Sequence, residues 1–228
     1  MKRVLIFGGY GFIGSHLYEE LKKKYKVFRY TATKKKKIKY NYKNFYKLVK
    51  VIRPNIIFFL SGTSNPDYNN KNYLIDFKKT NLVLQSLLFS LKENNFKGKL
   101  FYFSTIGVYG SNKLKTVEEK NETNPESFYT LSKSLAEKQC EFFSNNFNLN
   151  IIILRVCSIF GPRLKRQIIY KIIKELRNNK KNLELSGKLT DKREFLFVSD
   201  LIVILKKLIN SKVKNETLNI GSNKQYFI

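Results

Sequence analysis

Short apolar segments alternate with amphipathic segments along the chain, and no other feature of the sequence constrains the fold as strongly. The apolar segments predict strands at 4–7, 26–30, 56–60, 100–103, 150–155 and 217–220. The amphipathic segments predict helices at 12–24, 45–52, 81–92, 125–145, 167–178 and from residue 200 onward. Strands that are apolar throughout belong in a parallel sheet covered by helices on both faces. The sequence therefore predicts an α/β fold with a doubly wound parallel sheet.

The length of 228 residues predicts one large domain with a substantial core. After Pro162 the regular alternation of strands and helices ends, and short strands are expected near 183–185 and 196–198. No apolar run approaches the roughly 18 residues that a membrane-spanning helix requires. The apolar run before Gly8 is also too short for a secretory signal. We therefore expect no membrane span and a cytoplasmic location.

The net charge of +27 raises the question of an anionic partner such as nucleic acid. Of the 44 basic residues 36 are lysine, and asparagine, isoleucine, phenylalanine and tyrosine are abundant as well. This composition favours a compositional bias on a solvated surface over a nucleic-acid site. The two cysteines and His16 share no metal-ligand spacing, so neither a disulfide framework nor a metal site is predicted.

A glycine cluster lies between the first predicted strand and the first predicted helix. Gly8 permits a tight turn, Gly11 allows the backbone to approach a diphosphate, and Gly14 allows close packing of helix on strand. The diphosphate would lie at the helix N-terminus, where backbone N–H groups and the helix dipole favour anions. The cluster predicts dinucleotide binding.

The residues at the end of the second predicted strand indicate whether the cofactor is NAD or NADP. An acidic residue at its end binds the ribose of NAD, whereas an arginine accommodates the 2′-phosphate of NADP. No Asp or Glu occurs between Glu20 and Asp67, and the strand carries Arg29 with a lysine run at 34–37 behind it. The sequence therefore favours NADP, with NAD as the alternative.

Tyr129 and Lys133 are four residues apart in a predicted helix, so both project from one face. A nearby ammonium lowers the pKa of a phenol, which then can exchange a proton with a substrate hydroxyl or carbonyl. Ser104 and Thr105 follow the strand at 100–103, at the carboxyl end where ligands bind in open α/β sheets. These four residues form the predicted catalytic group.

Several segments together resemble one family, the extended short-chain dehydrogenases/reductases, in the NAD(P)-dependent nucleotide-sugar epimerase/dehydratase group. The matching segments are GGYGFIGSHL at 8–17, PNIIFFLSG at 54–62, STIGVYG at 104–110, LR at 154–155, FGPR at 160–163, REF at 193–195 and NIGS at 219–222. Asn81 matches the asparagine that begins the family's next helix. The resemblance covers nearly the whole chain and implies a Rossmann fold.

The resemblance implies a role for each matching residue. Tyr129 would be the acid/base, and Lys133 would lower its pKa and hold the nicotinamide ribose. Thr105 would hydrogen-bond the sugar oxygen, with Ser104 as neighbour or substitute. Cofactor contacts are implied for Gly8, Gly11, Phe12, Ile13, Gly14, Arg29, Leu60, Ser61, Gly62, Asn81 and Lys133. Substrate contacts are implied for Arg163, Arg193 and, at a position where the family often has Asn, Ser158.

The resemblance also implies a division of the chain. Residues 1–160 would form the Rossmann domain with the catalytic residues, and 161–228 a small, shortened substrate lobe interleaved with it. The family usually continues for some tens of residues beyond the NIGS segment, so we expect either a minimal lobe or a fragment. A homodimer through the helices at 81–92 and 125–145 is implied as well.

The sequence departs from the family's pattern directly after Thr105, and this difference narrows the range of expected reactions. Family members that eliminate water between C4 and C6 of the sugar carry an Asp-Glu pair directly after the catalytic Thr, and this chain has Ile106 and Gly107 there. We therefore expect a nucleotide-sugar epimerase or a 4-keto-sugar reductase contributing to surface polysaccharide, rather than a 4,6-dehydratase. The alternatives are a non-catalytic NADP- or RNA-binding protein of the same fold, or an inactive fragment. Retention of Thr105, Tyr129 and Lys133 with the glycine turn favours the enzyme.

Overall fold

A computed structural model describes residues 1–30, 41–62, 74, 77–111, 118–178 and 192–227. Six parallel strands form its main sheet in the order β2-β1-β3-β4-β5-β8. They are β1 (Arg3–Phe7), β2 (Lys26–Tyr30), β3 (Ile56–Phe59), β4 (Lys99–Thr105), β5 (Asn150–Val156) and β8 (Thr217–Ile220). The strand order reverses at β1, so the predicted doubly wound parallel sheet is confirmed.

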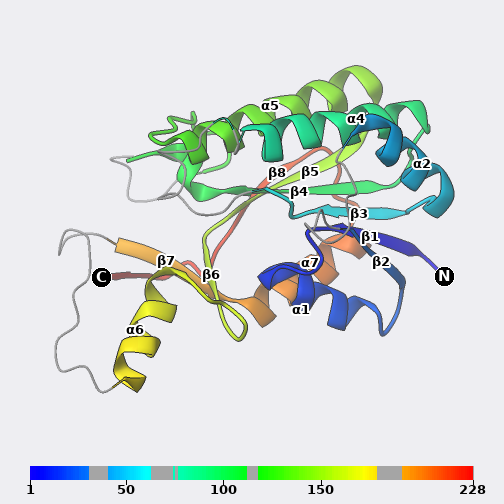
Figure 1. The fold of residues 1–228 in the computed structure, drawn as a ribbon. Coiled ribbons are helices and arrows are strands. Elements are labelled where there is room, and N and C mark those ends of the chain that lie inside the picture. The colour runs from blue at the N-terminus through cyan, green and yellow to red at the C-terminus, as the bar shows by residue number, and fades with distance from the viewer. Residues whose placement is uncertain (31–40, 63–73, 75–76, 112–117, 179–191, 228) are drawn as a thin grey trace.

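Helices cover both faces of this sheet, as Figure 1 shows. One face carries α2 (Tyr42–Ile52), α4 (Val83–Glu93) and α5 (Phe128–Phe147), and the other carries α1 (Phe12–Leu21) and α7 (Val198–Asn210). A π-helical turn, η1 (Lys78–Leu82), leads into α4. A short 3-10 turn, η2 (Ile106–Tyr109), follows β4 directly. The helical layers bury the sheet from both sides.

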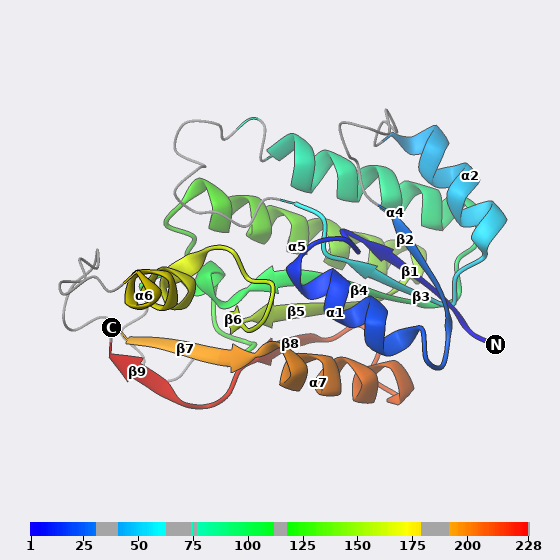
Figure 2. The same ribbon diagram turned by 60° about the horizontal axis from the view of Figure 1, so that its bottom comes forward.

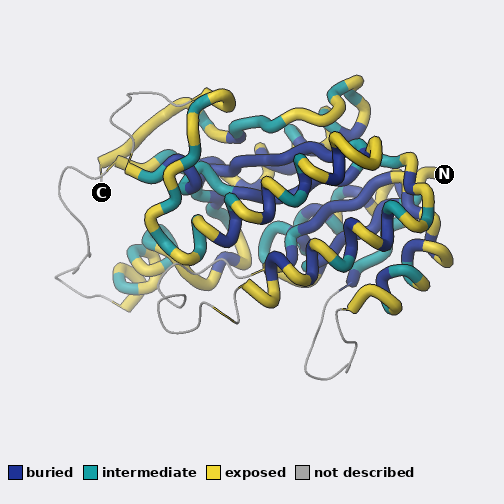
Figure 3. Tube along the Cα trace, turned by 90° about the horizontal axis from the view of Figure 1, so that it is seen from above, coloured by how far each residue is buried: buried dark blue, intermediate teal, exposed yellow. Residues whose placement is uncertain are grey.

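The strand side chains divide between two cores because successive residues of a strand point to opposite faces. Leu5 and Phe7 of β1 belong to the core under α2, α4 and α5. Val4 and Ile6 belong to the core under α1 and α7. Figure 3 shows the buried strands running through the middle of the molecule between partly exposed helices. This two-sided burial is the reason that the strands read as continuous apolar runs.

A second, smaller unit lies beyond the carboxyl ends of the main strands. Its sheet has the order β6-β7-β9, with β6 (Ser158–Phe160), β7 (Lys192–Phe197) and β9 (Gln225–Phe227). Strand β7 is parallel to β6 and antiparallel to β9. Helix α6 (Gln167–Arg177) stands beside this sheet in Figure 2. Since α7 and β8 return to the main sheet, the second unit is interleaved with the first; the boundary at residue 160 stays a prediction.

Several predicted element bounds were wrong, and local capping explains the clearest case. The helix expected from residue 125 begins at Phe128, because Ser127 caps it: the Ser127 hydroxyl accepts from the Thr130 N–H, and the Thr130 hydroxyl accepts from the Ser127 N–H. The strand expected at 196–198 is β7, which starts at Lys192 and gives way to α7 at Val198. The sequence did not predict β6 or β9. The strand expected near 183–185 lies outside the described residues.

Within the described part of the chain, no helix has the length and apolar character needed to cross a membrane. The two cysteines lie in different cores: Cys140, on α5, belongs to the core under α2, α4 and α5, and Cys157 belongs to the core under α1 and α7. Burial raises the pKa of both thiols, that of Cys157 to about 12.

Candidate active site

The glycine turn closes β1 through a short chain of backbone contacts. Gly8 has φ of +78°, a left-handed conformation that glycine adopts without steric penalty. Its N–H donates to the carbonyl oxygen of Tyr30 at 2.9 Å, and its carbonyl oxygen accepts from the N–H of Gly11 at 2.9 Å. A Cβ atom at Gly14 would overlap that same carbonyl oxygen. Helix α1 can therefore lie this close to the turn only because residue 14 is glycine.

The N-terminus of α1 suits an anion. Gly11 caps the helix without a side-chain hydrogen bond, and the first turn carries no acidic residue. The first N–H groups of an α-helix have no intrahelical partner, and the helix dipole there favours negative charge. Phe12 and Ile13 fix this turn by packing against the core. These residues fit the diphosphate of a dinucleotide.

Residues after β3 lie next to the same turn. The N–H of Leu60 donates to the carbonyl oxygen of Phe7 at 3.0 Å, which holds the ends of β3 and β1 together. Ser61 is buried, and Gly62 has φ of +131°; a Cβ atom at Gly62 would lie 2.9 Å from the hydroxyl oxygen of Thr80 on η1. Leu60, Ser61 and Gly62 thus lie at the strand edge where they were expected, and their cofactor contacts stay predictions.

Asn81 has a different setting. Its side chain is fully buried, and its amide donates to the carbonyl oxygen of Ser132 at 3.1 Å and to the Ser132 hydroxyl at 2.7 Å. Its side-chain oxygen accepts from Gln139 at 3.4 Å. Asn81 therefore ties η1 to α5, the helix that carries Tyr129 and Lys133.

Arg29 lies between two tyrosine rings. Its guanidinium carbon is 4.0 Å from the ring centroid of Tyr10, in the glycine turn, and 3.7 Å from that of Tyr18, on α1. Its aliphatic chain covers Gly9, where a Cβ atom would come within 2.7 Å of the Arg29 Cγ. Cation–π contacts thus hold Arg29 beside the glycine turn. Thr31 and the lysines at 34–37 lie outside the described residues.

Lys133 is buried against the end of β4. Its Nζ donates to the carbonyl oxygen of Phe103 at 2.7 Å and lies 5.3 Å from the ring centroid of Tyr102. Tyr129 lies one helical turn earlier on α5 and is half-buried. The helix therefore presents both residues toward the strand that ends in Thr105.

Ser104 and Thr105 separate in the structure. Thr105 is half-buried at the start of η2, and its hydroxyl accepts from the Gly107 N–H at 3.2 Å. Ser104 is buried and donates its hydroxyl hydrogen bond to the carboxylate of Glu137 on α5. Thr105 is thus the hydroxyl at the strand end, whereas the hydroxyl of Ser104 is directed into the protein.

Sequence reasoning missed the buried ion pair beyond Ser104. Nη2 of Arg155 on β5 contacts a Glu137 carboxylate oxygen at 2.8 Å, and Nε lies 3.2 Å from both oxygens. Nη1 of Arg155 donates to the Tyr109 hydroxyl at 2.7 Å, and that hydroxyl donates to Asn219 at 2.9 Å. Burial opposes the charge on Arg155, but the hydrogen bonds to Glu137 raise its pKa above the ordinary value. The signal in the sequence was an arginine inside an otherwise apolar strand.

The three expected substrate residues lie around the second sheet. Ser158 lies on β6 opposite Phe195 of β7, and Arg193 is exposed on β7 opposite Tyr226 of β9. Arg163 is exposed in the loop between β6 and α6. Glu194 anchors β7 to the segment after β8 by accepting from the Asn223 N–H at 2.5 Å. The contacts of Ser158, Arg163 and Arg193 with a substrate stay predictions.

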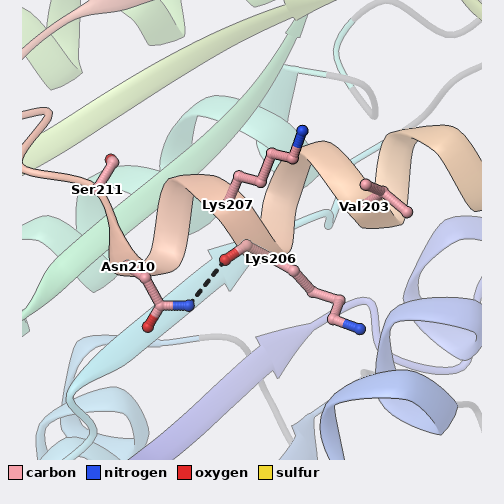
Figure 4. Close-up of a pocket in the computed structure, with 5 residues that line it drawn as sticks. All are labelled: Val203, Lys206, Lys207, Asn210 and Ser211. Carbon is pink, nitrogen blue, oxygen red and sulfur yellow. Dashed lines mark hydrogen bonds between the residues drawn. The ribbon is translucent and has the colours of Figure 1, made fainter.

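A surface pocket on α7 lies at the end of the main sheet opposite to the glycine turn, near the amino ends of the strands. Figure 4 shows its lining by Val203, Lys206, Lys207, Asn210 and Ser211. The carbonyl oxygens of Leu208 and Ser211 accept from Lys99 at the beginning of β4. The pocket therefore lies near the amino ends of the strands, away from the glycine turn and Lys133. Among the described residues, no cluster of three or more His, Cys, Asp or Glu could hold a metal ion.

The site thus indicates a class: an α/β protein with the glycine turn typical of dinucleotide-binding folds, and with a Tyr-Lys pair on the helix that packs against the strand ending in Thr105. Comparison with known proteins gives the family. The model of the NAD dependent epimerase/dehydratase family matches residues 4–221, and the chain belongs to this family.

Three relatives illustrate the range of the similarity. The chain is 28% identical to a dTDP-D-glucose 4,6-dehydratase of Dictyostelium discoideum over 98% of this chain and 59% of that protein. It is 29% identical to an uncharacterized UDP-glucose epimerase of Bacillus subtilis over 96% of this chain and 76% of that one. A UDP-glucuronic acid 4-epimerase of Bacillus cereus, solved with UDP-glucuronic acid and NAD, superposes with a TM-score of 0.86 at 25% identity, covering 99% and 79%. The chain thus spans about three fifths of the first relative.

The glycine turn yields a first prediction. Gly14→Ala should lower the free energy of unfolding by about 1–3 kcal/mol, because the new methyl group overlaps the Gly8 carbonyl. Gly11→Ala should leave stability within about 1 kcal/mol, since its Cβ would lie 3.2 Å from that oxygen. The methyl group of Gly11→Ala should weaken NAD(P)H binding by about tenfold or more, because it blocks the approach of the diphosphate. Thermal unfolding and fluorescence titration measure the two effects.

Gly98→Ala is the matched control. Its methyl group would overlap the carbonyl oxygen of Asn55 at the opposite edge of the sheet. It should lower stability while the folded protein keeps its affinity for the dinucleotide. Unchanged affinity in Gly11→Ala would contradict the assignment of this turn to the diphosphate.

Proposed function

We propose that this chain carries out hydride transfer at a sugar carbon of a nucleotide sugar, as an NAD(P)-dependent epimerase or 4-keto-sugar reductase. The observation that carries the proposal is the placement of Lys133 against the carbonyl of Phe103, two residues before Thr105 on β4. Tyr129 lies one turn away on the same helix, and the glycine turn lies at the same edge of the sheet. A hydroxyl, a phenol and an ammonium are the groups that such a proton and hydride exchange requires.

Each residue has one task in this proposal. The bound nicotinamide supplies or accepts the hydride. Tyr129 gives a proton to, or takes it from, the sugar oxygen, and Thr105 holds that oxygen by a hydrogen bond. Lys133 keeps a positive charge beside the phenol, which favours its ionised form. Arg163 and Arg193 hold the diphosphate of the substrate through charge-assisted hydrogen bonds.

The residues after Thr105 favour hydride chemistry without elimination. A 4,6-elimination needs an acid and a base, and η2 begins with Ile106 and Gly107, which supply neither. Ile106 packs against the core, and a Cβ atom at Gly107 would lie 3.1 Å from the methyl group of Thr130. We therefore propose an epimerase or a reductase in preference to a dehydratase.

The setting of Arg29 supports NADP as the preferred cofactor. The two tyrosine rings cover the guanidinium faces, which leaves the N–H edge to donate to a phosphate. NAD is the alternative. A non-catalytic NADP- or RNA-binding role is the second reading, and the buried placement of Lys133 beside β4 favours catalysis over it.

The catalytic proposal predicts the effect of Tyr129→Phe. The variant should keep its fold and its affinity for NAD(P)H, because the ring is preserved. Turnover should fall by roughly 10² or more, since the proton donor is lost. The assay follows NAD(P)H absorbance and sugar isomerisation with a panel of UDP-, dTDP- and GDP-sugars and their 4-keto forms. Tyr46→Phe, on α2, is the control and should retain full turnover; an unaltered rate for Tyr129→Phe removes this residue from the mechanism.

The cofactor proposal predicts that NADPH binds more tightly than NADH, and that Arg29→Met removes most of the difference. A charge-assisted hydrogen bond contributes about 1.5–3 kcal/mol, which corresponds to about 10- to 150-fold in affinity. Methionine retains the length of the side chain over Gly9. Lys26→Met, at the other end of β2, removes the same charge and should leave the preference intact. Equal affinity of the parent protein for the two cofactors at physiological salt would refute the preference.

We also propose that two copies associate through α4 and α5. These adjacent helices expose large apolar side chains: Phe89 on α4, and Phe128, Leu131, Leu135 and Phe142 on α5. The spacing on α5 places its four residues along one exposed stripe. Exposed apolar patches of this kind mark interfaces, and an isologous dimer would bury the same stripe of both copies.

The dimer proposal predicts a change of mass in solution. Leu135→Glu with Phe142→Glu should convert the dimer to a monomer in sedimentation analysis, because two charges would be buried at the interface. Val203→Glu is the control, since Val203 is an equally exposed apolar residue on α7, which lies on the other face of the sheet. A parent protein that sediments as a monomer at micromolar concentration would rule out this dimer.

A further inference from the structure

The buried charged residues of the described structure are concentrated in one place. Among the described residues three charged side chains are buried: Lys133, Glu137 and Arg155. Lys133 and Glu137 lie on consecutive turns of α5, and Arg155 faces Glu137 from β5. In a chain with a net charge of +27 this selective burial calls for a local explanation.

The carboxylate of Glu137 is saturated by partners from two strands. It accepts the hydroxyl of Ser104 on β4 and a forked contact from Arg155 on β5. Arg155 extends the network to Tyr109, the last residue of η2, and to the backbone carbonyl oxygen of Glu119 at 3.1 Å. The Tyr109 hydroxyl in turn donates to Asn219 on β8. The network therefore joins α5 to both sides of the turn that carries Thr105.

Helix α5 is thus fastened to β4 at two successive turns. Lys133 donates to the carbonyl oxygen of Phe103, and Glu137 accepts from the side chain of the next residue, Ser104. Tyr129 lies one turn before Lys133 on the same face. A slide or rotation of α5 relative to β4 would change the distance between Tyr129 and Thr105 directly.

Stability alone does not account for this network. Removing two charges from water is expensive, and well-packed apolar residues in place of a buried ion pair are often equally stable or more so. A forked pair differs from an apolar contact in its geometry, since it holds helix and strand in one register.

We propose that Glu137 and Arg155 are positioning residues that set the register of α5 against β4 and β5, and so hold Tyr129 and Lys133 at working distance from Thr105. The inference rests on the proposed function and adds a role for residues that touch neither substrate nor cofactor. It also gives Ser104 a structural partner, so Ser104 serves the site through Glu137 and does not replace Thr105.

The test replaces the pair as a unit, Glu137→Leu with Arg155→Met, so that no charge remains buried alone. The double variant should fold and bind NADPH within about twofold of the parent, because the glycine turn is untouched. With the best substrate of the nucleotide-sugar panel, kcat should fall by about 10- to 100-fold with little change in KM, as expected when reacting groups are displaced by about 1 Å. A folded double variant with parental kcat would overturn the proposal.

The pH profile separates positioning from simple loss of folded protein. The bond from Lys133 to the Phe103 carbonyl oxygen orients the ammonium group of Lys133. A shift of α5 against β4 breaks this bond and turns the ammonium group away from the phenol, so Tyr129 loses a positive charge that favours its ionised form and its pKa should rise. The ascending limb of kcat/KM for sugar oxidation should then move to higher pH. A smaller folded fraction would lower the rate at every pH and leave the midpoint unchanged, and that outcome contradicts the proposal.

Two further variants keep the test decisive. Lys138→Met with Glu141→Leu removes an exposed ion pair, 2.8 Å long, from the same helix and should change neither kcat nor the pH midpoint. Ser104→Ala removes one contact of Glu137 and leaves the ion pair. It should lower kcat in the same direction by about threefold or more, and it replaces the double variant if the latter does not fold. A folded Ser104→Ala with parental kcat and pH midpoint then overturns the proposal.

A direct titration keeps this inference independent of the proposed function. The tyrosinate absorbance of the protein minus that of its Tyr129→Phe variant reports ionisation of Tyr129 without any substrate. If no sugar of the panel is turned over, the proposed function fails, but the titration midpoint still should rise in the Glu137→Leu, Arg155→Met background. An identical midpoint in both backgrounds would refute the positioning role.

Discussion

Burial of a parallel sheet on both faces is the constraint on which the rest of this structure depends. Parallel pairing brings the carboxyl ends of β1, β3, β4 and β5 to one edge, and the helical layers fix that edge in place. The glycine turn, the Leu60–Gly62 segment and Thr105 lie there because their strands end there. Residues separated by about a hundred positions in the chain thus lie at one edge of the sheet without any direct attraction between them.

The six strands of the main sheet were predicted close to their observed bounds, whereas β6 and β9 of the small sheet were not predicted. Strands β1, β3 and β5 read as apolar runs because helices cover both of their faces. The three-residue strands β6 and β9 belong to a small, largely exposed sheet, so they carry no such run. The start of α5 was missed because periodicity does not locate a cap; the Ser127 and Thr130 pair does.

The site was predictable in its backbone and less so in its side chains. The spacing of Gly8, Gly11 and Gly14 follows from steric contacts within a few residues, so the sequence contains it in full. The partner of Ser104 lies 33 residues away, and the partners of Arg155 come from α5, from η2 and from the loop residue Glu119. Successive residues of a strand point to opposite faces, so the alternation rule alone separates Ser104 from Thr105. Applying that rule to β4 would have assigned them different tasks.

The arginines and lysines of this chain have different physical roles, and the difference bears on the meaning of its charge. Arg155 forms a buried fork with Glu137, and Arg29 stacks between two aromatic rings; both contacts use the planar guanidinium. Most described lysines are exposed, where solvent screens their charge, and Lys133 is the buried exception because a backbone carbonyl accepts from it. The net charge of +27 therefore describes mainly the lysine-rich surface, whereas the three buried charges lie together where α5 packs against β4 and β5. A charge acts most strongly on its neighbours where it is desolvated, so the proposed proton transfer depends more on these three buried charges than on the net charge of the surface.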